Sequence, residues 1–228
     1  MPWLTGITII LLVIGVAWGL GFAPVDYKQY NSYRIIYVHV PGSAVAMAGY
    51  YVMAICGAVG LIWRMKLAFM TMKAAATVGA LLTFISLVSG AIWGKPTWNT
   101  WWVWDARIVS VLILFFLYLG VLALQDAFQN QEAGDKAAAI LGLVGMVNIP
   151  IIYYSVDWVL TLHQGATIKF AGESSISASM AYPLVWMILT FYLMFVTLVL
   201  SYTRLEVLKR ERKTKWVEAL ILEKVGQS

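Results

Sequence analysis

Long apolar stretches alternate with short polar segments along this chain. Six stretches contain no Asp, Glu, Lys or Arg, and each approaches or exceeds the roughly 18–20 residues that a helix needs to cross a bilayer. They are Pro2–Val25, Ile35–Trp63, Ala74–Gly94, Ile108–Gln125, Ala137–Val156 and Ser174–Thr203. Because backbone polar groups in hydrocarbon must pair within their own segment, each stretch is predicted to be a helix. The pattern therefore predicts an all-α polytopic membrane bundle with six transmembrane helices, in a single domain over residues 1–228.

Three prolines refine the predicted helices. Pro41 and Pro183 are expected in the first turns of the second and sixth helices, where a missing N–H costs little. Pro150 falls inside the fifth apolar stretch, with Asn148 nearby, and predicts a kink there. Three segments then lie on the side of the membrane away from the chain termini, at approximately 23–40, 95–107 and 157–181. Candidate functional residues are expected in these segments.

Charge and composition agree with a membrane protein and give it an orientation. Only 12% of the residues are charged, about half the share in a soluble domain. The side that carries both termini holds 11 of the 16 basic residues, against 5 on the other side. This bias predicts N-in/C-in topology in the bacterial inner (cytoplasmic) membrane, with periplasmic functional loops. The net charge of +5 follows from that topology, so no nucleic acid partner is expected, and the basic tail 204–228 is predicted to be cytoplasmic and solvated or headgroup-lying.

Targeting and cysteine patterns narrow the class further. Met1–Gly21 lacks a basic n-region and an Ala-x-Ala site, so a retained first span is expected rather than a cleaved signal. The single cysteine, Cys56, lies within the second apolar stretch. The absence of a Cys-x-x-Cys-His motif excludes covalent attachment of haem in the manner of a c-type cytochrome.

The two histidines are the first candidate ligands. His39 and His163 are the only histidines of the chain, and both are predicted on the outer side, with His39 just ahead of a helix start. A neutral imidazole is a good ligand for iron, zinc or copper, and two of them could supply both axial positions of a haem. The alternative is that they are ordinary interfacial polar side chains that share a side of the membrane.

A tryptophan-rich loop at about 93–107 favours the interpretation of the two histidines as haem ligands over that of ordinary interfacial side chains. It holds five of the chain's 11 tryptophans, namely Trp93, Trp98, Trp101, Trp102 and Trp104. Interfacial aromatic belts also use tryptophan, and such a belt is the alternative interpretation. If residues 98–107 form a short interfacial helix, Trp98, Trp101 and Trp102 share one face. Such a shelf suits a large, flat, apolar ligand.

Charged residues beside this loop fit the same ligand. The propionates of a haem would favour outward cations, of which Lys28, Arg34, Lys95 and Arg107 are the candidates; arginine suits bidentate carboxylate binding best. Asp105 could pair with Arg107, cap the fourth helix, or orient a histidine N–H. The sequence leaves these three roles open.

At these residues the chain resembles a known family. The segment Trp93–Asp105 resembles the WWD signature of the haem-handling proteins of cytochrome c maturation (CcmC/CcmF/CcsA). The segments Asn31–Pro41 and Thr161–Gly165, each with one histidine, are similar to those of the small six-span CcmC members. The resemblance extends over essentially the whole chain.

The resemblance implies a site and a role. Non-covalent haem b is expected at the outer face, with His39 and His163 on the iron. The tryptophans of the WWD loop and Asp105 would hold the ring, and Arg34 and Arg107 are the first candidates for the propionates. Family members pass haem to the periplasmic chaperone CcmE, with the small membrane protein CcmD and the ABC transporter CcmAB as further partners beside the lipid bilayer.

A presenter of haem without its own turnover reaction is therefore expected. The alternatives are a membrane haem-containing redox protein, a cytochrome c haem lyase, or a transporter subunit whose tryptophan loop is only a partner surface. A histidine pair deep within the spans would have favoured an electron carrier.

Overall fold

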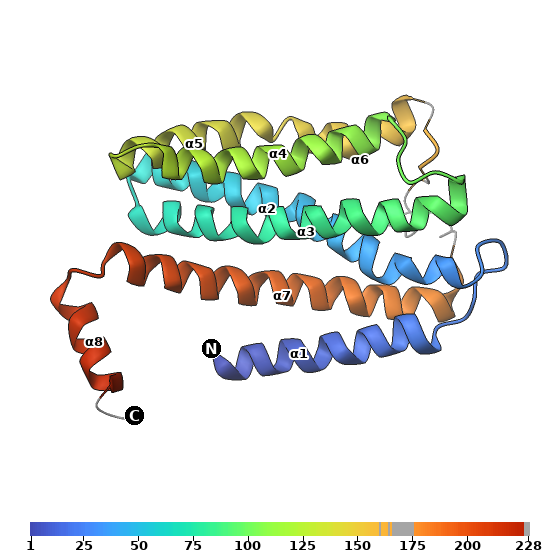
Figure 1. Cartoon of the computed structure of the whole chain (residues 1–228), viewed down its shortest axis with the longest axis horizontal. Coiled ribbons are helices and arrows are strands. Elements are labelled where there is room, and N and C mark those ends of the chain that lie inside the picture. The colour runs from blue at the N-terminus through green and yellow to red at the C-terminus, as the bar shows by residue number, and fades with distance from the viewer. Residues whose placement is uncertain (160, 164, 166–175, 226–228) are drawn as a thin grey trace.

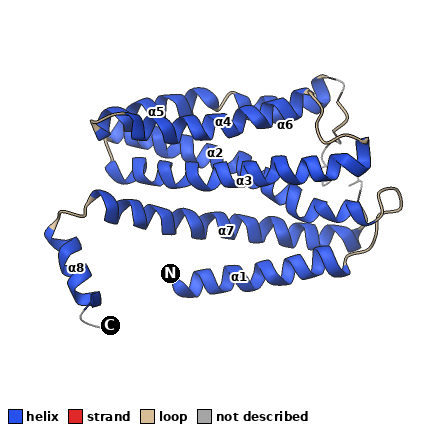
Figure 2. Ribbon diagram, in the orientation of Figure 1, coloured by secondary structure: helices blue, strands red, loops and turns tan. Residues whose placement is uncertain are grey.

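The computed structural model describes residues 1–159, 161–163, 165 and 176–225, and this part of the chain is helical (Figure 2). A π-helical turn, Ala17–Phe22, continues the first helix, and a 3₁₀ turn, Asn31–Ile35, leads into the second. The α-helices are α1 Pro2–Val16, α2 Ile36–Trp63, α3 Lys66–Trp98, α4 Ala106–Ala127, α5 Gln131–Gly145, α6 Asn148–Trp158, α7 Ala178–Arg210 and α8 Lys215–Val225. The all-α class predicted from the apolar pattern is confirmed.

Six helical segments of the described chain are long and apolar enough to cross a membrane. They are Pro2–Phe22, Asn31–Trp63, Lys66–Trp98, Ala106–Ala127, Gln131–Trp158 and Ala178–Arg210. Each contains or overlaps one of the six predicted stretches, so the predicted number of apolar helices is confirmed. Figure 1 shows them running along one common axis, with α2 and α3 in the middle and α1 at the edge. Helix α2 packs against α3, α5 and α7, whereas α1 packs against α7.

Small residues let the central helices approach closely. The buried Tyr118 of α4 donates its hydroxyl to the carbonyl of Ala46 in α2, at 2.7 Å. A methyl group at Gly79 of α3 would overlap the Tyr118 ring. Close backbone approach at small residues is a general way in which membrane helices associate. This packing fixes α2 relative to α3, and so it sets the position of the residues at the ends of these two helices.

Two of the three predicted proline positions are wrong, those of Pro41 and Pro183. Pro41 and Pro183 do not occupy first turns, because α2 already begins at Ile36 and α7 at Ala178, which makes each proline the sixth residue of its helix. The residues of each apolar stretch that precede its proline already form a helical turn, and membrane helices tolerate the lost hydrogen bond. As a consequence, His39 is the fourth residue of α2 and does not precede it.

The interruption of the fifth span is as predicted. Helix α5 ends at Gly145 and α6 begins at Asn148, with a turn between them. Pro150 is the third residue of α6, where its missing N–H leaves no intrahelical bond unmade. The Asn148 side chain donates to the carbonyl of Ser110 in α4 at 2.9 Å, which ties the break to a neighbouring helix.

Candidate functional site

The two histidine rings lie next to each other. The start of α2 and the end of α6 lie at the end of the bundle opposite α8 (Figure 1). His39 belongs to α2 and His163 follows α6, and the centroids of their rings are 6.3 Å apart, with 35° between the ring planes. A metal ion bonded to one nitrogen of each of two imidazoles, at about 2.0–2.1 Å, places the ring centres on the order of 6 Å apart. Within the described chain no group of three or more His, Cys, Asp or Glu side chains could hold a metal. The spacing of the two rings is compatible with a metal ion bound between them.

Helix α3 holds the His39 ring in place. The Nδ1 atom of His39 lies 3.0 Å from the carbonyl oxygen of Ser86 and 3.1 Å from the hydroxyl of Ser89. Because a carbonyl only accepts, Nδ1 carries the proton and Nε2 keeps the lone pair; a carbonyl partner of this kind is the usual support of a metal-bound histidine. A Cβ atom at Gly90 would lie 2.9 Å from Cε1 of the ring. Nε2 is thus the nitrogen prepared to bind a metal.

Tryptophans at the end of α3 flank both histidines. The Trp93 ring stands edge-on to His39, with centroids 5.7 Å apart, and its Nε1 donates to Gln29 Oε1 at 2.6 Å. The Trp98 ring lies 6.2 Å from that of His163. Two members of the tryptophan-rich loop therefore form an aromatic wall beside the histidine pair.

The predicted short helix over residues 98–107 is wrong. Helix α3 continues to Trp98 and stops where Asn99 adopts a left-handed conformation, at φ 59°. Residues 99–105 are not helical, and the hydroxyl of Thr100 bonds the backbone of Trp102 within this segment. The left-handed Asn99 interrupts the helical repeat, so Trp98, Trp101 and Trp102 do not share a helix face.

The other three tryptophans form the surface of the loop. Trp101 is 58% and Trp104 78% exposed. Trp102 packs edge-on against Trp104, with centroids 5.6 Å apart. The Trp102 Nε1 atom is buried without a hydrogen-bond partner, so its N–H donor is uncommitted.

Asp105 connects α4 to the segment that carries His163. Its Oδ1 accepts the N–H of Ile108 at 2.8 Å and so caps α4, one of the three roles considered for this residue. Its Oδ2 accepts the hydroxyl of Thr161. The same Thr161 oxygen accepts the backbone N–H of His163 at 3.1 Å. No ion pair joins Asp105 to Arg107 among the residues described.

The candidate cations are placed in different ways. Arg34 donates to the carbonyls of Leu20, at 3.0 Å, and Ala23, at 2.7 Å, and so fastens the end of the first span. Lys95 donates to the carbonyl of Asn99 at 3.3 Å, and Lys28 lies over the ring of Tyr27. Arg107 is half-buried in the first turn of α4. Lys169, also on the outer side by sequence, lies outside the described residues.

Several residues of the site were not singled out from the sequence. Ser86, Ser89 and Gly90 have i, i+3, i+4 spacing, which places them on one face of α3. That spacing was visible, but only the packing of α3 on α2 shows that this face meets His39. Gln29 and Thr161 carried no local signal, since each acts through a partner distant in sequence.

Comparison with known proteins identifies the family. The protein-family model described as "CcmC: Heme exporter protein C" matches residues 1–218. Heme exporter protein C of Escherichia coli K12 is 49% identical over 224 residues, which are 98% of this chain and 90% of that protein. The protein of that name from Haemophilus influenzae is 51% identical over 219 residues, 96% of this chain and 89% of that protein. The one from Bradyrhizobium diazoefficiens is 46% identical over 210 residues, 92% and 80% of the two chains. This chain therefore belongs to the CcmC, or heme exporter protein C, family.

Proposed function

We propose that this protein binds haem b non-covalently between His39 and His163 and presents it for transfer to the haem chaperone CcmE in cytochrome c maturation. The observation that carries the proposal is the 6.3 Å separation of the two imidazole rings. The printed name of the relatives, heme exporter protein C, supports haem as the cargo.

The donor set of the site fits a haem. His39 and His163 would bind the iron from opposite sides, and the porphyrin would supply the remaining ligands. The Nδ1–H of His39 is bound to the Ser86 carbonyl, which fixes the ring orientation and raises the basicity of Nε2. In this role the two histidines are ligands, and Ser86 is a positioning residue.

The tryptophans would hold the ring and leave part of it accessible. Trp93 and Trp98 flank the histidines, and stacking on aromatic faces favours a porphyrin beyond the gain from buried area. Trp101 and Trp104 are exposed and would cover the outer edge, where CcmE engages. The unpartnered Trp102 Nε1 would donate a hydrogen bond to bound haem.

Asp105 would act on His163 through Thr161 and not as a ligand. Both of its oxygens are already occupied, one by the α4 cap and the other by the Thr161 hydroxyl. Arg107, which has no ion pair in the described chain, is the first candidate for a propionate. Arg34 has five N–H donors and would offer those that its two carbonyl contacts leave.

The orientation completes the proposal. The excess of basic residues on the side of the termini would place that side in the bacterial cytoplasm. The histidine end of the bundle would then face the periplasm, where CcmE receives haem. CcmD and CcmAB are the further partners that we expect in the membrane. A histidine pair at one end of the bundle serves presentation better than electron transfer across it.

A transfer experiment tests the whole proposal. Haem-loaded protein in detergent is mixed with apo-CcmE, the two are separated by affinity tag, and haem is followed by its Soret absorbance. Transfer is expected from wild type and not from His39→Ala/His163→Ala. Haem that remains entirely on the wild-type protein, in the presence and absence of CcmAB and CcmD, would contradict the presenter role.

A further inference from the structure

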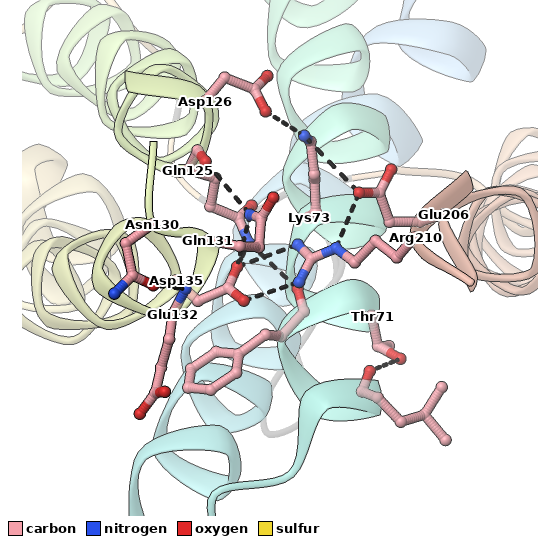
Figure 3. A network of polar contacts seen from close by, with 12 residues as sticks. Thr71, Lys73, Gln125, Asp126, Asn130, Gln131, Glu132, Asp135, Glu206 and Arg210 are labelled. Atoms are coloured by element: carbon pink, nitrogen blue, oxygen red, sulfur yellow. Dashed lines mark hydrogen bonds and ion pairs between the residues drawn. The ribbon is translucent and has the colours of Figure 1, made fainter. Parts of the chain in front are cut away.

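A second polar site lies at the other end of the bundle, away from the histidines. We call it the basal network and define it by the residues joined in Figure 3: Lys73, Gln125, Asp126, Asp135, Glu206 and Arg210. Arg210 of α7 donates to both oxygens of Asp135 in α5, at 2.7 and 3.0 Å, and its Nε donates to Glu206 at 3.0 Å. Lys73 of α3 pairs with Asp126 of α4 at 2.5 Å and with Glu206 at 3.8 Å. The network thus joins α3, α4, α5 and α7.

A cavity with a volume of about 380 Å³ opens on this network. Its charged lining consists of the carboxylates of Asp126 and Glu206 and of five cations, Lys73, Lys209, Arg210, Arg212 and Lys213. The cations outnumber the carboxylates by three. The cavity is therefore suited to an anion.

The floor of the cavity has hydrogen-bond donors to spare. Arg210 has five N–H donors and uses three of them, whereas Lys73 has three and donates one hydrogen bond, to Asp126. The side chains of Arg210 and Lys73 are only 12% and 13% exposed, and each is paired with carboxylates. These contacts hold the donor groups in place. Lys209, Arg212 and Lys213 form an exposed rim, and no ion pair among the described residues neutralises them. A rigid floor and a charged rim are what an oxyanion with several acceptor oxygens requires.

The surroundings of the cavity place it at the level of lipid headgroups. The sixth apolar span ends at Arg210, and after a turn α8 leads away from the axis of α7 (Figure 1). Helix α8 leaves Trp216 48% and Leu222 72% exposed, while Val217 is buried. A helix with exposed tryptophan and leucine next to a span is typical of a segment that lies in the membrane interface.

From these observations we infer that the cavity binds the phosphate of an anionic phospholipid from the adjacent leaflet. The phosphate oxygens would accept the spare N–H groups of Lys73 and Arg210, and the rim residues would balance the charge of the headgroup. Basic pockets between spans are known to select such headgroups. The site is independent of haem, because it lies at the opposite end of the bundle.

Lipid retention by the whole protein tests this inference. Delipidated protein in detergent is titrated with phosphatidylglycerol or with phosphatidylcholine of the same acyl chains, and bound lipid is counted by native mass spectrometry. The cavity variant is Lys209→Gln/Arg212→Gln/Lys213→Gln. The matched control, Arg64→Gln/Lys66→Gln/Arg204→Gln, removes three exposed cations from the same end of the bundle, none of which lines the cavity.

Wild type and control are expected to retain phosphatidylglycerol in preference to phosphatidylcholine, and the cavity variant to bind it roughly tenfold to a hundredfold more weakly. An equal loss in the control would overturn the inference in favour of diffuse surface charge. Displacement of the lipid by equimolar inorganic phosphate would assign the cavity to a soluble phosphate instead. Circular dichroism checks that each variant folds; if the triple variant does not, Arg212→Gln and Lys213→Gln are measured singly, and unchanged lipid binding in both would also overturn it.

Discussion

The rings of His39 and His163 lie 6.3 Å apart, although more than half of the chain separates the two residues in sequence. One ring is fixed by the Ser86 carbonyl of α3, and the backbone N–H of the other residue is tied through Thr161 to the cap of α4. Because different helices support these two residues, we propose that their imidazoles bind a metal between them.

Gly90→Ala is expected to weaken haem binding. A Cβ atom at residue 90 would lie 2.9 Å from Cε1 of His39, so the ring must turn away from its place against α3. A displaced ligand of this kind typically costs tenfold or more, about 10–100-fold for supporting groups of metal sites. Haem titration in detergent, followed at the Soret band, measures the effect. Gly6→Ala is the control, since no atom lies within 4 Å of its added methyl group; equal affinity for both variants would contradict the prediction.

Thr161→Val is expected to loosen His163 while leaving the fold intact. The substitution removes the hydroxyl that joins Asp105 to the His163 backbone, and a hydrogen bond to a charged group contributes about 1.5–3 kcal/mol. Haem should dissociate faster and its low-spin electron paramagnetic resonance signal should broaden. Thr161→Ser keeps the hydroxyl and should restore both properties. A valine variant with the dissociation rate and the signal of wild type would show that this contact does not position the histidine.

How far the sequence determines this structure differs between its parts. The six apolar helices were predictable because the thickness of hydrocarbon sets the length of an uncharged stretch. Helix starts were not, since each helix begins five residues before its proline, Pro41 or Pro183, and not at the proline itself. The i, i+3, i+4 spacing of Trp98, Trp101 and Trp102 misled, because Asn99 ends one helix and Asp105 begins the next.

The candidate site was predictable in composition and not in contacts. That both histidines share one side followed from the order of the spans. The proximity of the two histidines depends on how α2 packs against α3 and on the path of the chain after α6. Local sequence patterns predict neither of these. For the same reason Ser86, Gly90 and Thr161 emerge only from the structure.

The exposed tryptophans should matter for transfer more than for retention. Trp104 is 78% exposed and contacts Trp102 rather than either histidine. Trp104→Ala is therefore expected to bind haem nearly as well as wild type but to pass it to CcmE more slowly. Single-turnover transfer rates and equilibrium haem affinity, measured on the same preparation, separate the two effects. A variant that loses haem without CcmE would assign Trp104 to the haem pocket itself.

The buried ion pair of the basal network should dominate stability at that end. Asp135→Ala leaves the partly buried Arg210 without its bidentate partner, although Glu206 still pairs with it. The expected loss is therefore below that of a fully buried pair, about 3–5 kcal/mol. Denaturant or thermal unfolding in detergent should show this loss. Glu132→Ala breaks an exposed pair with Lys136 on the same helix and should leave the unfolding midpoint unchanged. Equal midpoints for the two variants would mean that the buried pair adds no net stability.

The absorption spectrum of the haem-loaded protein is the sharpest test of ligation by His39 and His163. Wild type should show a low-spin bis-imidazole spectrum, and His39→Gly and His163→Gly should each lose it and regain it on addition of free imidazole. The double variant should bind little haem. A bis-imidazole spectrum that persists in His39→Gly/His163→Gly without added imidazole would show that other groups hold the iron.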